Sequence, residues 1–252
     1  MDSLEPQYGV SKAEHVARLL LNRIISANMK PGSSFGTEAE LLGKFQVSRP
    51  TLRESLRILE SQGVLTLRPG PRGGIMVSKP SINVIAHTLS VYLRLNDVPF
   101  IEILRARMAI EPVLARDAAV FGGEDDFDKM EETIKGLERA GDDNEVVYRE
   151  NRAFHSVIAR AASNPVLEVY WETISVLATG EGAGFKYTKR NVIHIVKSHR
   201  AILNACRERN PTLAYDLTVD HLGELDDLLK RRFKGRLGEP TEITLKNGRR
   251  IV

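Results

Sequence analysis

Residues 36–77 read GTEAELLGKFQVSRPTLRESLRILESQGVLTLRPGPRGGIMV, and this stretch decides the fold of the first part of the chain. A short amphipathic helix pattern is followed by the turn QVS, a second helix pattern and two strand-like segments. Ser48 is a typical helix N-cap, Pro50 suits the first helical turn, and Gly63 stands where a left-handed cap would end the helix. This order predicts a winged helix-turn-helix, a fold whose second helix enters the major groove of DNA.

The second helix of this unit carries a cationic face. Arg49, Arg53 and Arg57 follow each other at intervals of four residues, so at about 100° per residue they fan across roughly 80°. An apolar face lies about 100° away on the helical wheel and carries Leu52, Leu56 and Leu59. A solvated surface is the simpler interpretation of three arginines, because glutamates are interleaved with them. The cap, proline and glycine that bound the helix favour DNA binding.

Segments 64–67 and 75–77 are predicted as two strands joined by a glycine-rich turn. Glycine allows the backbone to approach a phosphate or the minor groove, while Arg68 and Arg72 supply charge. A nucleotide-binding phosphate loop is the alternative, but the turn lies between strands and lacks the Gly-Lys-Ser/Thr ending. Upstream, a first helix is predicted from an apolar stripe that consists of Ala13, Val16, Ala17, Leu19, Leu20, Ile24 and Ile25.

Segment 1–79 resembles the GntR superfamily of bacterial transcription regulators. The resemblance is carried by MKPGSSFGTEAELLGKF (29–45), VSRPTLRESLRILESQGVL (47–65) and LRPGPRGG (67–74). It implies DNA contacts from Ser48, Arg49, Thr51 and Arg53 and a close approach of the wing to the groove at Gly70. Ala39 is a departure, because many members have an arginine at that place. We also expect Lys44 and Arg72 to contact phosphates.

Composition agrees with a two-domain regulator. The chain has 252 residues, of which 42% are hydrophobic, and a formal net charge of +3. Residues 1–79 hold 11 Lys/Arg against 7 Asp/Glu, whereas the remainder holds 25 against 26, so positive charge is concentrated in the predicted DNA-binding part. The single cysteine, Cys206, excludes an intrachain disulfide framework. No signal-peptide pattern or long apolar run is present, and we expect a cytoplasmic protein without membrane contact.

The rest of the chain is predicted to be helical. Helix patterns cover 82–95, 99–121, 125–140, 146–162, 165–179, 189–208 and 211–233, with short breaks that favour an antiparallel bundle. The expected fold class is therefore mainly α, with a winged helix-turn-helix at 1–79 and an all-helical domain at 80–235 for effector binding and dimerisation. Residues 236–252 contain Asn247 and Gly248 between alternating side chains, so they form either a hairpin or a disordered tail.

Histidines carry the chemistry of the helical part. Asn151 and His155 lie four residues apart on one predicted helix, so both side chains project from the same face and could hold one ion. His199 and His221 belong to two later helices, and they are too far from His155 along the chain to form a local metal motif with it. An isolated helical histidine is usually hydrogen-bonded or exposed, which is the interpretation for His15, His87 and His194.

The helical part resembles the FCD effector domain of the FadR subfamily, through EILRARMAIEPVLARDAAV, NRAFHSVIARAASNPVL, SHRAIL and AYDLTVDHL. In metal-binding members an aspartate and three histidines hold a divalent cation beside the ligand cavity. The matching positions are Asn151, His155, His199 and His221. The resemblance implies a zinc-like or nickel-like site, weakened because asparagine attracts a cation less than aspartate does. Arg107 is expected either to grip the carboxylate of an effector or to pair with Glu111.

Together these features predict a homodimeric regulator that binds an inverted-repeat operator in double-stranded DNA and responds to a small carboxylate effector. Repression is the expected sign of regulation. Two other classes remain as alternatives: a metal-dependent hydrolase that acts on a small carboxylate, and an architectural DNA-binding protein without an effector. The hydrolase gives segment 1–79 no role and lacks a convincing general-base carboxylate.

Overall fold

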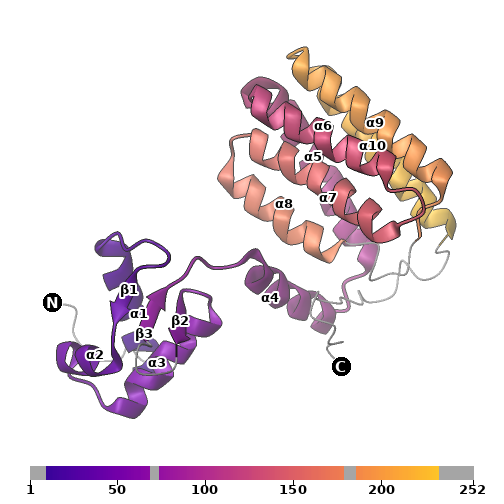
Figure 1. Ribbon diagram of the computed structural model, residues 1–252. Helices are drawn as coiled ribbons and strands as arrows, with labels where there is room; N and C mark the ends of the chain where they lie inside the picture. The colour runs from indigo at the N-terminus through magenta and orange to yellow at the C-terminus, as the bar shows by residue number, and fades with distance from the viewer. Residues whose placement is uncertain (1–9, 69–73, 179–185, 233–252) are drawn as a thin grey trace. The chain divides into compact units, whose positions relative to one another are not determined.

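The computed structural model describes residues 10–68, 74–178 and 186–232, with the backbone alone for 225–232. The described residues form two compact units, one up to Val84 and one from Ile85 onward. Figure 1 shows three helices and a small sheet in the first unit and helices throughout the second. The predicted fold class, a winged helix-turn-helix followed by a helical bundle, is confirmed. Gly70, Arg72 and the predicted tail at 236–252 lie outside the described residues.

Each helix of the first unit begins at a hydroxyl side chain. The elements are α1 (Lys12–Ser26), β1 (Ser34–Gly36), α2 (Glu38–Phe45), α3 (Arg49–Ser61), β2 (Leu65–Arg68) and β3 (Gly74–Val77). Ser11, Thr37 and Ser48 cap the three helices by accepting from the backbone N–H three residues on. Gln46 ends α2 at φ 51°, and Gly63 follows α3 at φ 73°, which are left-handed conformations. The predicted caps at Ser48 and Gly63 are thus confirmed.

The three strands form one antiparallel sheet in the order β1-β3-β2. β2 and β3 pair as the predicted wing hairpin, with Leu65 opposite Val77 and Arg68 opposite Gly74. β1 was not predicted, since so short a segment shows no recognisable alternating pattern. Its pairing with β3 joins distant parts of the unit, from Ser34 to Met76. The strand thus depends on tertiary contact.

The core of the first unit lies between α1, α3 and the sheet. Leu52, Leu56 and Leu59 of α3 are buried there, as the apolar face predicts. The predicted stripe of α1 is wrong at its end, because Ile25 is 67% exposed while Ile24 is buried. Ile25 lies about 100° from Ile24 on the helical wheel, past the edge of the buried stripe that consists of Val16, Ala17, Leu20 and Ile24.

In the second unit, α5 contacts four of the other helices. The elements of this unit are α4 (Ile82–Leu95), α5 (Phe100–Phe121), α6 (Glu124–Arg139), α7 (Asn144–Ala161), α8 (Pro165–Leu177), α9 (Lys189–Arg207) and α10 (Pro211–Arg232). α5 contacts α7, α8, α9 and α10, while α6 lies against α7 and α9 (Figure 1). All predicted helix ends agree within two residues. Capping by Asp143, Asn164 and Thr188 starts α7, α8 and α9 where the sequence changes pattern.

Among the described residues of the bundle, the buried charged and histidine side chains gather at one place in a mostly apolar core. Phe127, Phe154 and Trp171 are its largest fully buried side chains, packed with leucine, isoleucine and alanine. His155 and His199 are buried next to them, although histidine is normally found at intermediate depth. A buried polar cluster in an apolar bundle is costly unless it is satisfied, so this cluster is the candidate site of the second unit.

Candidate functional site

α3 presents its arginines to solvent in one row. Arg49, Arg53 and Arg57 are exposed, and the leucines of the opposite face anchor the helix in the core. Residues four apart are separated by about 6 Å along the helix axis, so the row spans roughly 12 Å. Guanidinium groups on an anchored helix are the donors that read guanine edges and phosphates in the major groove.

The start of α3 offers hydrogen-bonding groups beside these charges. Ser48 Oγ accepts from the backbone N–H of Thr51 at 3.3 Å and lies 2.7 Å from Thr51 Oγ1. The free N–H groups of a helix N-terminus attract anions, and both hydroxyls stand at that end. Ser48 and Thr51 therefore put two hydroxyl groups at the N-terminus of α3, the end of the helix that attracts anions.

Arg49 is held only loosely in the free protein. Its Nε lies 3.7 Å from Glu38 Oε1, and the Arg49 side chain is 70% exposed. An exposed pair of this kind contributes at most about 1 kcal/mol, so a phosphate or a base edge can replace the carboxylate. Lys44 at the end of α2 and Arg68 at the end of β2 are exposed as well. Ala39 is an exposed residue of α2.

Three helices of the second unit bring three histidines together. His155 comes from α7, His199 from α9 and His221 from α10. One ring nitrogen of each lies within 4.8 Å of the other two, and ring centroids are separated by 4.9 to 5.4 Å. Phe154 stacks on His199 with a centroid distance of 3.8 Å, which fixes the orientation of that imidazole. Helix packing thus joins histidines that are far apart in the sequence.

Unsatisfied atoms at this cluster fit a cation. Nε2 of His155, both ring nitrogens of His199 and Oδ1 of Asn151 are buried without a hydrogen-bond partner. Buried polar atoms nearly always have one, so several orphans at one place indicate a missing group. Zinc–nitrogen bonds of about 2.1 Å put tetrahedral ligands roughly 3.4 Å apart, which the observed spread of the nitrogens allows with small side-chain shifts. The residues present therefore fit a divalent metal ion.

Two imidazoles of the cluster, those of His199 and His221, are in the form that binds metals. Burial, and next the neighbouring His221, lowers the pKa of His199 well below its usual value. Burial, and next His155, lowers the pKa of His221 to about 3. Both rings are neutral at physiological pH, and a neutral imidazole has a free lone pair for a cation.

A buried carboxylate stands behind His155. Glu111 of α5 accepts from Arg107 Nε at 2.6 Å through one oxygen, and its other oxygen lies 2.7 Å from His155 Nδ1. Burial opposes ionisation of Glu111, but Arg107 and then His155 outweigh it, so the pKa of Glu111 falls well below its usual range. The carboxylate thereby occupies Nδ1 and leaves Nε2 of His155 facing the cluster. The predicted Arg107–Glu111 pair is present, whereas its extension to His155 was not foreseen from the sequence.

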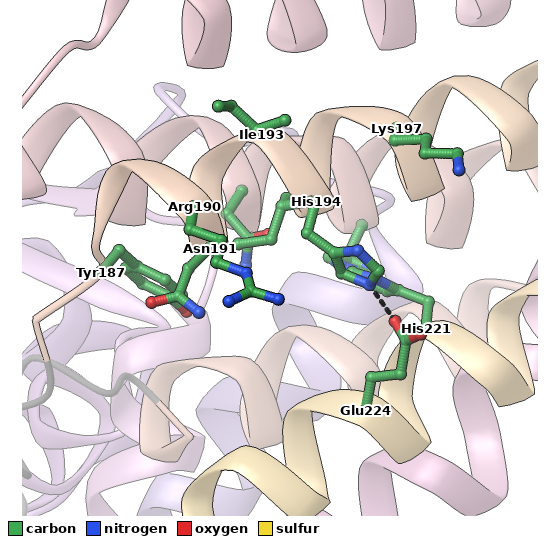
Figure 2. A pocket seen from close by; sticks show the side chains of 11 residues that line it. Tyr187, Arg190, Asn191, Ile193, His194, Lys197, His221 and Glu224 are labelled. Atoms are coloured by element: carbon green, nitrogen blue, oxygen red, sulfur yellow. Dashed lines mark hydrogen bonds and ion pairs between the residues drawn. The ribbon is translucent and has the colours of Figure 1, made fainter.

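A cavity of about 460 Å³ opens next to the histidine cluster. Asn151, His155 and His221 line its inner side, and α9 supplies Arg190, His194 and Lys197 (Figure 2). His194 pairs with Glu224 of α10, as the dashed line in Figure 2 marks, in accord with the ordinary role expected for this histidine. The volume suits a small organic molecule, and it adjoins the atoms that would hold a cation.

No helix among the described residues is both long and apolar enough to pass through a lipid bilayer.

Comparison with known proteins gives a consistent picture. Residues 12–77 match the model of bacterial regulatory proteins of the gntR family, and residues 102–224 match the FCD domain. The "Uncharacterized HTH-type transcriptional regulator YcbG" of Bacillus subtilis is 30% identical over 83% of this chain and 86% of its own length. The "Galactonate operon transcriptional repressor" of Escherichia coli is 24% identical over 80% of this chain and 89% of its own.

A solved structure, "Streptococcus agalactiae GntR", has the same fold, with a TM-score of 0.63 and 23% identity over 85% of this chain and 99% of that one. The matched families and relatives are transcription regulators and not enzymes, so the hydrolase alternative loses its support. The resemblance that residues 29–74 indicated is confirmed over residues 12–77, and the match to the FCD domain extends over residues 102–224. The chain belongs to the gntR family of bacterial regulatory proteins and carries an FCD domain behind its winged helix-turn-helix.

Proposed function

We propose that this regulator is a cytoplasmic homodimer that binds an inverted-repeat operator and represses transcription until a small carboxylate enters the FCD domain. The supporting observation is the row of exposed arginines on α3, a helix anchored by buried leucines. Residues 1–79 act as the DNA-binding domain and 80–235 as the effector and dimerisation domain. Two copies of α3 related by symmetry require a nearly symmetric operator.

Base reading is assigned to Arg49, Arg53 and Arg57, whereas Ser48 and Thr51 hold phosphates at the N-terminus of the same helix. Phosphate contacts outside α3 come from Lys44, Arg68, Arg72 and the wing backbone at Gly70. This division follows from chemistry: a guanidinium can bind a guanine edge through two hydrogen bonds, while a lysine acts as a point charge.

A divalent cation, zinc-like or nickel-like, is assigned to His155, His199 and His221 with Asn151 as a neutral fourth ligand. When bound, it supplies positive charge to a cavity whose lining includes the neutral imidazole of His221. The orphan nitrogens and the orphan Oδ1 of Asn151 support the assignment. Asn151→Asp should raise metal occupancy, because a carboxylate attracts the cation more strongly than an amide. Elemental analysis of the purified wild type and variant tests this, and absence of metal from both would end the assignment.

An anionic effector suits the charge of the cavity. Arg190 and Lys197 line it without an ion-pair partner among the described residues, while its one acidic lining residue, Glu224, is paired with His194. Arg107, which lies deeper in the bundle, is proposed to add N–H donors for the carboxylate of the effector. A relative named for the galactonate operon agrees with an organic acid, although the name describes that protein alone.

Effector binding must favour one mutual orientation of the two DNA-binding domains, since a ligand that binds both orientations equally well shifts no equilibrium between them.

The proposed function is tested by measuring operator binding by the full chain with and without candidate acids and Zn²⁺. Sequence-specific binding that an acid weakens supports the proposal. Specific binding that no acid changes supports the architectural alternative, and equal affinity for operator and scrambled duplex refutes both.

A further inference from the structure

The composition of α4 disagrees with its place in the fold. Among its 14 residues, Ile82–Leu95, Arg94 is the only Lys, Arg, Asp or Glu. α4 nevertheless lies at the edge of the second unit (Figure 1). A surface helix normally carries charged residues on its outer face, whereas a helix that is apolar on all sides is normally buried on all sides. The outer face of α4 therefore lacks the charges that contact with water would favour.

One stripe of α4 packs into the bundle. Ala86 and Ser90 are buried, and Leu89 and Leu93 pack with Ala86 against the start of α5 and the end of α8. At about 100° per residue, these four residues cover about 100° of the helix circumference, which is the usual width of a stripe that attaches a helix to a core. This stripe accounts for the attachment of α4 to its own chain.

A second stripe of α4 faces solvent although most of its side chains are apolar. Its members are exposed and follow each other in steps of three, four and three residues: Ile85, Thr88, Tyr92 and Leu95, flanked by Val91. Tyr92 is 63% exposed and Leu95 80%. On the helical wheel the middle of this outer stripe lies about 150° from the middle of the buried one. Steps of three and four residues mark the seam along which one helix packs on another.

The charge of the outer stripe permits a second copy of the same helix as its partner. Arg94 lies about 120° from the middle of the stripe, so two identical stripes can meet without like charges facing each other. A two-fold dimer brings one surface patch against itself, and the patch must therefore be compatible with its own copy. A neutral heptad seam meets this condition.

The area of the outer stripe also suits a pair of copies. Its four apolar side chains are exposed by 39 to 80%, and a large side chain covers roughly 150–250 Å², so one stripe offers on the order of 400 Å². Two copies would bury on the order of 800 Å² of apolar surface. A standard interface buries about 1,600 Å², of which roughly 57% is non-polar. The two stripes thus supply most of the apolar area that a stable dimer needs.

We propose that the outer stripe of α4 is the dimerisation surface of this regulator, where α4 of one copy packs along α4 of a second copy. The inference rests on the proposed homodimer and names the surface that forms it. Only residues 78–81 separate the end of β3 from the start of α4. The contact therefore joins the two copies at the part of the chain that follows each DNA-binding domain directly.

A smaller exposed apolar group on α8 provides the matched control. It consists of Val166, Val169 and Tyr170, which span little more than one helical turn and so form no seam of two heptads. Tyr170 is 59% exposed, nearly the same as Tyr92. Tyr92→Glu and Tyr170→Glu are thus the same chemical change at equally exposed positions of the same unit.

Sedimentation equilibrium of the full-length protein without DNA measures dimerisation of these variants. Tyr92→Glu and Leu95→Glu should each raise the dissociation constant of the dimer at least about tenfold, because each places an unpaired carboxylate in an apolar contact. Tyr170→Glu should stay within about twofold of the wild type. Tyr92→Phe, which keeps the ring, should dimerise like the wild type, and circular dichroism checks that every variant is folded.

Operator binding gives a second measurement of the same contact. The probes are an inverted repeat, selected from random duplexes by the wild type, and a duplex that carries one half of it. Tyr92→Glu should weaken binding to the full repeat at least about tenfold and leave binding to the half-site within about twofold, since only the full repeat engages two copies. Tyr170→Glu should change neither.

The inference fails if Tyr92→Glu and Leu95→Glu dimerise as well as the wild type. Dissociation caused by Tyr170→Glu instead would place the interface on α8. An intact dimer in which Tyr92→Glu lowers the unfolding temperature more than Tyr170→Glu would show that another segment of the same chain covers α4, and this too would overturn the inference. In all three cases the proposed homodimer stands. A wild type that stays monomeric at every concentration and binds the repeat as one copy would refute the homodimer and the surface together.

Discussion

Glu111→Gln is the substitution that most directly tests the buried arrangement of the second unit. In the wild type, Glu111 is 2.6 Å from Arg107 and 2.7 Å from His155, and all three side chains are nearly buried. Glutamine keeps the size and one acceptor, but it cannot neutralise Arg107. Removing one partner of a buried ion pair costs about 3–5 kcal/mol, and we expect about 3 kcal/mol, the low end, because the amide oxygen can still accept one hydrogen bond.

The same substitution should weaken metal binding. Carboxylates that orient a metal-binding histidine typically contribute about 10- to 100-fold in affinity, or about 1.4–2.7 kcal/mol. Denaturant unfolding of the metal-free protein measures the first effect, and a Zn²⁺ titration against a competing chelator measures the second. Glu111→Asp, which keeps the charge but is one methylene shorter, should fall between wild type and glutamine in both assays.

Glu102→Gln is the matched control. It lies on the same helix, pairs with Arg105 at the surface and removes the same charge, so it should cost less than about 1 kcal/mol and leave Zn²⁺ affinity intact. If Glu111→Gln and Glu102→Gln have the same metal affinity, the contact between Glu111 and His155 does not orient that ligand. The geometric argument would then be refuted even if the unfolding free energies differ.

Three further outcomes are expected. Arg49→Ala and Arg53→Ala should each cost about 1–3 kcal/mol of operator binding and relax base preference, whereas Lys44→Ala should mainly reduce the salt dependence; unchanged sequence selectivity in binding assays would contradict this division. Gly63→Ala should destabilise the protein by about 1–2 kcal/mol in denaturant unfolding, because φ is 73° and the new Cβ would lie 3.2 Å from Pro80 Cα, while Gly43→Ala in open space should be neutral or stabilising. Chelation should lower the unfolding temperature of the wild type, an effect absent if the histidine cluster binds no metal.

Local signals explain why the helices could be predicted so closely. A cap such as Ser48 or Asn164 binds backbone groups within three residues, so the adjacent sequence is enough to predict where the helix begins. β1 has no such local determinant, because Ser34 and Gly36 become a strand only where β3 passes beside them. Ile25 shows the same limit: periodicity placed it in the apolar stripe of α1, but only the packing decides how wide that stripe is.

The site of the second unit shows where prediction from sequence ends. A spacing of four residues placed Asn151 and His155 on one face, and the same spacing joined Arg107 to Glu111. Both are properties of a single helix. The contact between Glu111 and His155 depends on how α5 packs against α7. The residue spacing within one helix cannot predict a contact between two helices. In an isolated helix, Glu111 could pair with Arg107 while both side chains stay exposed to solvent. In the structure, however, Glu111 is buried against the imidazole of His155. Because leucine at positions 107 and 111 would fill such a core without burying charges, the buried pair is better explained by a role in the histidine cluster.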